Sequence, residues 1–185
     1  GVANGVLNLL NQELIPAKYR AICPVSAPVV FDPTAKAPVF EQALKTVFQG
    51  DDELIRYFIR VIGYAILGRP VGQVFFILYG PTASNGKSKL VEALRNVLGP
   101  YATILNTTTI MTKSNVSDGA TPSLADLEGR RLAIVSEPNR KHKIDSGIVK
   151  QMTGDESMSV RRIYENSKDM SIDAVMMLPT NFMPE

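Results

Sequence analysis

The stretch that decides the fold is residues 75–88, which reads Phe75-Phe76-Ile77-Leu78-Tyr79-Gly80-Pro81-Thr82-Ala83-Ser84-Asn85-Gly86-Lys87-Ser88. Its first residues are bulky and apolar, so they predict a buried strand, and a polar loop follows. After this stretch, apolar residues recur at helical spacing: Leu90, Val91, Leu94, Val97 and Leu98. Strand, loop and helix in this order are the context that a phosphate-binding loop requires.

The loop has the chemistry that a polyphosphate needs. Backbone N–H groups of the loop and of the helix start can point into one concavity, where they bind an anion. Gly86 lets the backbone approach the ligand, Lys87 can reach the outer phosphates, and the Ser88 hydroxyl can ligate Mg²⁺. We therefore expect a nucleotide to be bound by Gly80, Pro81, Thr82, Ala83, Ser84, Asn85, Gly86, Lys87 and Ser88.

The spacing of the two loop glycines departs from the usual pattern. Five residues separate Gly80 from Gly86, where four are usual. Either the loop is one residue longer, or Pro81 stands in the place of the first glycine. A glycine-rich turn before a helix, without nucleotide, is the alternative interpretation.

Length and composition restrict the class of protein. The 185 residues suffice for one domain, or for one domain with a small companion, and a hydrophobic content of 45% supplies a core. The net charge is +2, although residues 130–168 carry nine Lys/Arg against five Asp/Glu. This local excess allows an anionic partner, and a solvated surface explains it equally well.

Several site types are excluded by composition. Cys23 and His142 are the only residues of their kinds, which excludes an internal disulfide and metal sites built from His and Cys. The apolar runs are too short to cross a bilayer, so we expect no membrane association and a cytoplasmic location. Because the chain starts at Gly1 without methionine, we also expect a fragment of a longer protein.

Proline and glycine residues indicate the boundaries of segments along the chain. Residues 1–38 are irregular and predict an extended arm with short edge strands at 6–9 and 29–31. Helical periodicity follows from 40 to 48 and from 54 to 66. We therefore divide the chain into an arm and helical module at 1–70 and a nucleotide-binding core at 71–185.

Beyond the loop helix, the core segment predicts further strands and a helix. Candidate strands span residues 101–105 and 132–137, and a candidate helix spans 144–152. Two β-leaning runs, 157–164 and 170–178, predict a hairpin with a polar tip. The run at 132–137 is typical of a strand that is buried on both faces.

Two polar residues end apolar runs of this core. Glu137 follows the run at 132–136, and Asn181 follows the run at 175–178. Ligands of open α/β sheets bind beyond the carboxyl ends of the strands, so both residues should lie near the terminal phosphate. The carboxylate can polarise water or hold Mg²⁺ through water, and the amide can position that water. Alone, either residue is equally an ordinary surface residue at a strand end.

Four segments together resemble a known family: residues 80–88, 127–137, 150–162 and 178–181. The set is similar to the superfamily 3 helicase core of phage and plasmid primase-helicases, which is related to the poxvirus primase-helicase. Residues 31–68 resemble the helical domain that precedes this core. The resemblance implies an AAA+-like, three-layer P-loop α/β fold with a parallel central sheet, a β-hairpin insertion and a small N-terminal helical module.

The resemblance also implies an activity: an ATPase that forms a ring, usually a hexamer, and moves along DNA at replication forks in a bacterial host. Lys87 and Ser88 match the residues for ATP and Mg²⁺, Glu137 matches the catalytic and metal-binding acid, and Asn181 matches the sensor. Many relatives carry a second acid where this chain has Ser136. The arginine finger of the family lies further along, so we expect this chain to bind ATP and to hydrolyse it poorly.

In the resemblance, residues 157–170 match a hairpin that projects into the central channel of the ring. Lys168 at its tip, with Arg161 and Arg162, would contact DNA phosphates. Lys150 would reach the nucleotide of a neighbouring subunit. For each of these cations, a solvated surface is the alternative.

Two other classes of function stay open. A monomeric small-molecule kinase also has a phosphate-binding loop, although no basic lid is visible after the loop helix. A DNA-binding or scaffold module without hydrolysis is the second alternative. Phosphotransfer to a nucleoside by a monomer would favour the first, and DNA binding without ATPase activity would favour the second.

Overall fold

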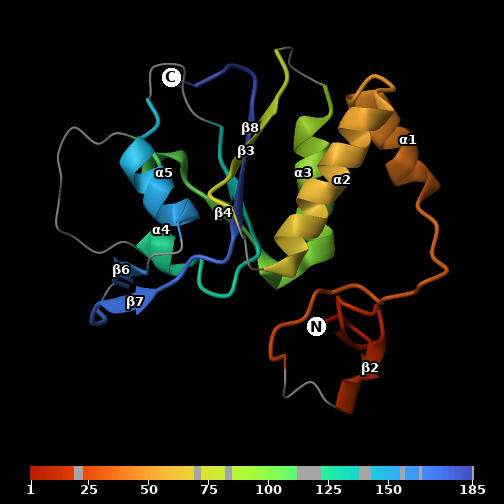
Figure 1. Cartoon of the computed structure of the whole chain (residues 1–185), viewed down its shortest axis with the longest axis horizontal. Coiled ribbons are helices and arrows are strands. Elements are labelled where there is room, and N and C mark those ends of the chain that lie inside the picture. Colours follow the sequence, from red (N-terminus) through yellow and green to blue (C-terminus); the bar gives the residue numbers. More distant parts are fainter. Residues whose placement is uncertain are drawn as a thin grey trace. The chain divides into compact units, whose positions relative to one another are not determined.

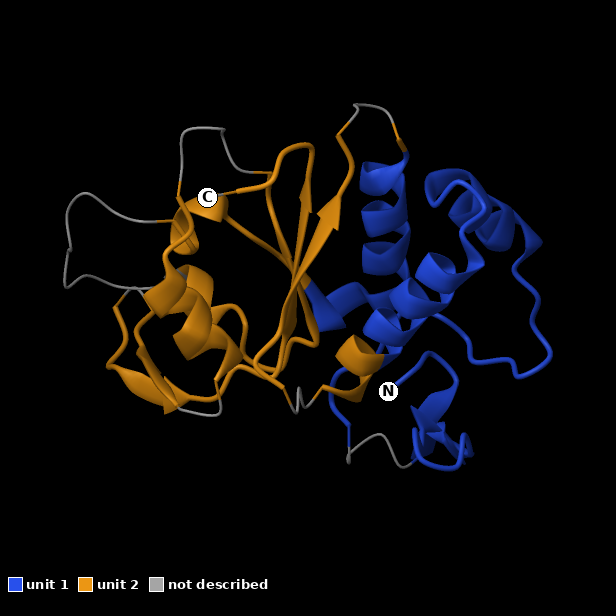
Figure 2. Cartoon of the chain, turned by 45° about the horizontal axis from the view of Figure 1, so that its top comes forward, with its two compact units in different colours: residues 1–63, 86–102 blue, residues 64–85, 103–185 orange. Residues whose placement is uncertain are grey.

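The computed structural model describes residues 1–18, 23–68, 72–81, 85–111, 122–137, 143–154, 157–162 and 164–184. The chain divides into two compact units, residues 1–63 with 86–102 and residues 64–85 with 103–185 (Figure 2). These units do not coincide with the segments 1–70 and 71–185, whose standing as separate domains stays a prediction.

The helices and strands follow in chain order (Figure 1): β1 (Gly5–Leu7), β2 (Leu14–Pro16), α1 (Pro38–Val47), α2 (Asp52–Leu67), β3 (Phe75–Tyr79), α3 (Lys87–Leu98), η2 (Gly99–Tyr101), β4 (Ala102–Leu105), η3 (Thr107–Thr109), α4 (Pro122–Ala125), β5 (Leu132–Val135), α5 (Ser146–Thr153), β6 (Met158–Val160), β7 (Lys168–Met170) and β8 (Val175–Thr180).

The arm in the first unit is held by hydrogen bonds rather than by a sheet alone. β1 and β2 form an antiparallel pair in which Val6 faces Ile15. The Asn4 side chain accepts from Phe31 N at 3.0 Å and donates to Phe31 O at 2.9 Å. The expected strand at 6–9 is confirmed in part by β1, whereas residues 29–31 form no strand and β2 was not expected.

Both expected helices before the loop are confirmed as α1 and α2. Gly50, with φ 79°, ends the first by donating from its N–H to Lys45 O at 2.8 Å. The Asp51 carboxylate starts the second by accepting from Leu54 N at 2.9 Å, which satisfies a free N–H group of the first turn. Only part of the apolar face of α2 is core, because Leu54 and Ile59 are exposed.

The second unit is built on a four-stranded sheet in the order β3-β8-β5-β4. β8 runs parallel to β3 on one side and to β5 on the other, with Tyr79 opposite Thr180 and Ile134 opposite Met177. Every residue of β5 is buried. This confirms the predicted α/β fold with a parallel central sheet.

One face of the sheet packs against α4 and α5, which lie beside it in the second unit (Figure 1). Met152 of α5 is buried there together with Val135 and Leu178. Residues that alternate with these along the strands are buried as well: Leu132, Ile134, Val175 and Met177. The central strands are therefore buried on both faces, which explains their uninterrupted apolar sequences.

The hairpin predicted from the two β-leaning runs is wrong in its second strand. β6 pairs with β7, with Met158 opposite Met170 and Val160 opposite Lys168. Residues 175–180 instead enter the centre of the large sheet as β8. The physical reason is burial: an isolated hairpin would expose one face of this apolar run, whereas the sheet centre covers both.

Leu178 offers a direct test of this placement. Its side chain is 0% exposed in β8, so Leu178→Ala should lower the free energy of unfolding by about 2–5 kcal/mol. Leu10 is 95% exposed, and Leu10→Ala should change it by no more than about 0.5 kcal/mol. Urea unfolding of the two variants measures both values, and equal losses would contradict the position of β8.

Candidate functional site

The carboxyl ends of β3, β8 and β5 meet at one edge of the sheet. Gly80 N, which follows β3, donates to Thr180 O at 3.1 Å. Asn181, which follows β8, donates to Glu137 Oε1 from its backbone N at 3.1 Å and from Nδ2 at 2.8 Å. The structure thus brings Glu137 and Asn181 into direct contact, beside the strand that leads into the loop.

This contact fixes the orientation of the carboxylate. Two N–H donors of Asn181 hold the same oxygen, Glu137 Oε1. Oε2 of Glu137 receives no hydrogen bond from any residue that the structure describes, so it can accept one from a water molecule. The side chain of Glu137 is exposed, which gives water access to it. The pair can therefore hold a water at a set position, as hydrolysis requires.

Ser136, the residue before Glu137, is turned toward Thr107. Thr107 N donates to Ser136 Oγ at 3.0 Å, and the two hydroxyl oxygens lie 2.7 Å apart. Thr107 Oγ1 also donates to Ser136 O. This network fixes the backbone directly before Glu137.

Sequence reasoning missed Thr107, because the residue lies outside the predicted strands and helices. The available signal was its position: it follows β4, and so lies at the carboxyl end of a sheet strand. The buried polar residues of the described chain are Lys87, Thr107 and Thr180. Two of them are thus at strand ends on this edge of the sheet.

The start of α3 has the features of an anion site. Gly86 is the N-cap, with φ 82° and no side-chain cap hydrogen bond. A Cβ at Gly86 would lie 2.7 Å from Val47 Cγ2, so both its conformation and its space require glycine. Thr82, Ala83 and Ser84 of the expected loop lie outside the described residues.

Lys87 and Ser88 open α3, where Lys87 is 7% exposed and Ser88 is exposed. Phosphate binding by the buried ammonium group of Lys87 stays a prediction. Lys87 and Ser88 belong to the first unit, and Glu137 and Asn181 to the second. The roles of all four residues stay predictions.

The Mg²⁺ expected from the sequence stays a prediction. Among the described residues, no group of three or more His, Cys, Asp or Glu side chains could hold a metal ion. Mg²⁺ commonly takes one or two protein oxygens and completes its shell with phosphate and water. Ser88 and Glu137 are the protein oxygens expected to serve this purpose.

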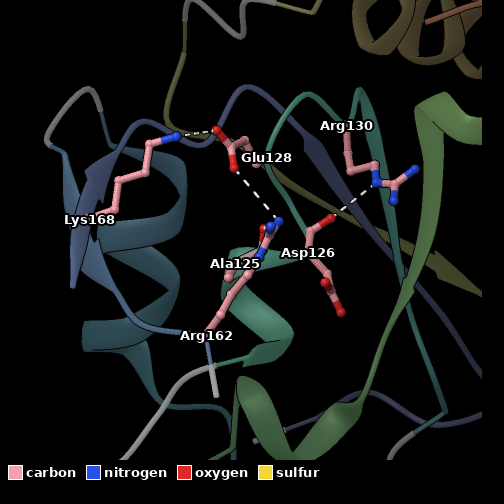
Figure 3. A network of polar contacts seen from close by, with 6 residues as sticks. All are labelled: Ala125, Asp126, Glu128, Arg130, Arg162 and Lys168. Atoms are coloured by element: carbon pink, nitrogen blue, oxygen red, sulfur yellow. Dashed lines mark hydrogen bonds and ion pairs between the residues drawn. The ribbon is translucent and has the colours of Figure 1, made fainter. Parts of the chain in front are cut away.

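The cations expected to bind DNA lie next to an acid (Figure 3). Lys168 Nζ forms an ion pair with Glu128 Oε1, and Arg162 Nη2 lies 3.7 Å from Glu128 Oε2. Arg162 Nη2 also donates to Ala125 O at 3.2 Å. The hydrogen bond and charge of Lys168, with the charge of Arg162, hold the pKa of Glu128 below its usual value. Glu128 is therefore ionised beside both cations.

The other predicted cations are exposed. Arg161 precedes Arg162 between β6 and β7, and Lys150 lies in the last turn of α5. Lys168 is the first residue of β7, opposite Val160, and so stands beside the tip of the hairpin. Contact of these cations with DNA or with a neighbouring subunit stays a prediction.

A family model described as "Family of unknown function (DUF5906)" matches residues 78–185, which is more than half of the chain. The chain belongs to family DUF5906. A second family model, "D5 N terminal like", matches residues 1–49. The DUF5906 match includes Glu137, Asn181 and the β6–β7 hairpin.

Two viral proteins are similar to this DUF5906 chain in sequence. "Putative helicase L207/L206" of Acanthamoeba polyphaga mimivirus is 30% identical over 117 residues, which cover 63% of this chain and 12% of that protein. "Putative helicase 022R" of Frog virus 3 (isolate Goorha) is 30% identical over 115 residues, which cover 62% and 12%. The chain therefore spans about an eighth of the length of these relatives.

Solved structures support the fold. An apo structure of the C-terminal region of NrS-1 superposes with a TM-score of 0.63 at 16% identity, covering 82% of this chain and 37% of that one. A second apo form of that region gives 0.62 at 15% identity, covering 83% and 34%. Within the described residues, no helix combines the length and the apolar character needed to cross a membrane.

Proposed function

We propose that this DUF5906 chain is the ATP-binding and hydrolysing core of a DNA helicase. The observation that carries the proposal is the contact of Glu137 with Asn181, beside the strand that leads into the Gly86-Lys87-Ser88 loop. The sequence similarity to viral proteins named helicases supports the same class.

In this proposal, each residue of the site has a defined task. Loop N–H groups and the Lys87 ammonium bind the β- and γ-phosphates of ATP. Glu137 Oε2 accepts a hydrogen bond from the attacking water, and Asn181 keeps the carboxylate in place through Oε1. Thr107 holds the backbone of Ser136 and so positions Glu137. Mg²⁺, held by Ser88 and through water by Glu137, would supply neutralising charge at the phosphates.

The finer assignment rests on the motif resemblance. It is a superfamily 3, AAA+-type primase-helicase of a phage or mobile element, which acts as a hexameric ring in the cytoplasm of a bacterial host. The exposed position of Lys150 on α5 leaves it available to a neighbouring subunit. The hairpin cations Arg161, Arg162 and Lys168 would contact DNA phosphates in the ring channel.

The test is ATP binding and ATP hydrolysis by the chain, with and without single-stranded DNA. We expect ATP binding that depends on Mg²⁺, slow ATP turnover by this chain, and an increase of that turnover by DNA. Phosphotransfer to a nucleoside by a monomer would favour a kinase instead. DNA binding without nucleotide binding would favour a scaffold module, and mass measurement in solution with ATP decides between monomer and ring.

The acid beside the hairpin leads to a prediction for DNA affinity. Glu128→Gln should raise the affinity for single-stranded DNA by about two- to fivefold at low salt, because Lys168 and Arg162 lose their competing carboxylate. The slope of affinity against salt should steepen by about one unit. Fluorescence anisotropy with a labelled oligonucleotide measures both quantities.

Glu92 provides a matched control for this variant. It forms a 2.9 Å ion pair with Lys89 on α3, and both side chains are exposed. Glu92→Gln makes the same change of charge away from the hairpin, so it should leave the salt slope unchanged. An affinity that falls in Glu128→Gln would show that Glu128 positions Lys168 rather than competing for it.

A further inference from the structure

Tyr164 is an aromatic residue in the segment between β6 and β7. It is 100% exposed and adopts φ 66°, a left-handed conformation that bulky residues rarely adopt. The hydrogen bond from Glu165 N to Arg162 O, at 3.2 Å, spans this position. Folding gains nothing from a ring in this place, because the ring buries no surface.

Other tyrosines of the chain are used differently. Tyr101 is buried and donates from its hydroxyl to Val25 O. The Tyr64 hydroxyl accepts from Gly72 N at 2.8 Å, and the Tyr64 ring packs edge-on against Phe76. The rings of Tyr64 and Tyr101 therefore stabilise the fold, whereas the ring of Tyr164 is fully exposed at a residue with positive φ. Backbone strain at an exposed position suggests a role in binding.

The charges around Tyr164 indicate the class of ligand. Arg161 and Arg162 precede it, and Lys168 follows it at the start of β7. The acids of this region are Glu165 and Asp169, together with Glu128, which pairs with Lys168 and Arg162. An aromatic ring among cations is the combination that binds single-stranded nucleic acid, since rings stack on bases while cations contact phosphates.

We infer that Tyr164 stacks on an unpaired base of single-stranded DNA, while the neighbouring cations contact the phosphates on either side. Duplex DNA is a poorer ligand, because its bases are already stacked on one another. The inference rests on the proposed function, in which this hairpin binds DNA. It adds a contact to the base where the proposed function has contacts to phosphate alone.

The chain contains no tryptophan, which permits a specific reporter. In Tyr164→Trp, the introduced indole is the sole tryptophan, and stacking on a base should quench its fluorescence. The probes are an oligothymidylate and an abasic oligonucleotide of equal length and charge. We expect the oligothymidylate to quench and to bind more tightly, and the abasic strand to bind without quenching.

Substitutions separate stacking from other contacts. Tyr164→Phe should keep the affinity of the wild type, whereas Tyr164→Ala should lower it by about fivefold to about a hundredfold. Tyr164→Leu keeps apolar surface but lacks a flat π-system, so it should behave as Tyr164→Ala does. Lys168→Ala should lower the salt slope by about one unit, and Tyr164→Ala should leave that slope unchanged.

Three results would overturn the inference, and they differ in what they say of the proposed function. Equal affinities of the wild type and Tyr164→Ala, with no quenching in Tyr164→Trp, would remove the base contact and leave DNA binding intact. Wild-type affinity in Tyr164→Leu would indicate an apolar contact of the kind that a protein partner makes. Absence of DNA binding by the wild type would remove both the inference and the DNA-binding part of the proposed function.

Discussion

Glu137→Gln is expected to bind ATP as the wild type does and to hydrolyse it at least about a hundredfold more slowly. Glutamine keeps the shape of the side chain, and its Oε1 can still accept from the Asn181 N–H groups. The variant lacks the carboxylate oxygen that would polarise water. The variant side chain keeps its position but is no longer basic. The substitution should therefore lower kcat and leave the ATP affinity unchanged.

Calorimetric titration with ATP and a phosphate-release assay measure the two quantities for Glu137→Gln separately. Glu92→Gln is the matched control, since it makes the same chemical change at an exposed acid on α3. Turnover in Glu137→Gln equal to that of the control would remove Glu137 from the catalytic site. A parallel loss of ATP affinity would instead indicate that the carboxylate chiefly holds Mg²⁺.

Lys87→Ala is expected to lower ATP affinity by about ten- to a hundredfold, because it removes the cation proposed to contact the outer phosphates. The measurement is the rise in thermal unfolding temperature that ATP and Mg²⁺ produce. A ligand that binds the native state raises this temperature according to its affinity. The wild type should show the rise, and Lys87→Ala should show little or none at the same ATP concentration.

Two further variants make the Lys87 result specific. Lys89→Ala removes the same charge two residues later, where the side chain is 85% exposed and pairs with Glu92, so it should respond to ATP as the wild type does. Lys87→Met keeps the length and burial of the side chain without its charge. A normal ATP response in Lys87→Met would show that the position serves packing rather than phosphate binding.

Local signals in the sequence were sufficient for the helices. Apolar periodicity over residues 40–48 and 54–66 predicted α1 and α2. The meeting of Glu137 and Asn181 also followed, because both end apolar runs and parallel strands share a carboxyl edge.

Other pairings between distant residues could not be predicted. β8 lies between β3 and β5 because its apolar residues are buried on both faces there. The sequence of residues 170–178 alone is equally compatible with a strand of a hairpin. Thr107 contacts Ser136 across 29 residues, and Lys168 pairs with Glu128 across 40. These residues become neighbours only when the sheet is complete. A short segment of sequence therefore does not identify their partners.

The position of β8 has a consequence for biosynthesis. It is the last strand of the large sheet along the chain, yet it occupies an interior position, with Phe75 opposite Met176 about a hundred residues later. Until that segment leaves the ribosome, β3 and β5 both lack β8, with which they pair in the finished sheet. The nascent chain therefore carries β3 without this partner while about a hundred further residues are synthesised, a state in which chaperones commonly bind.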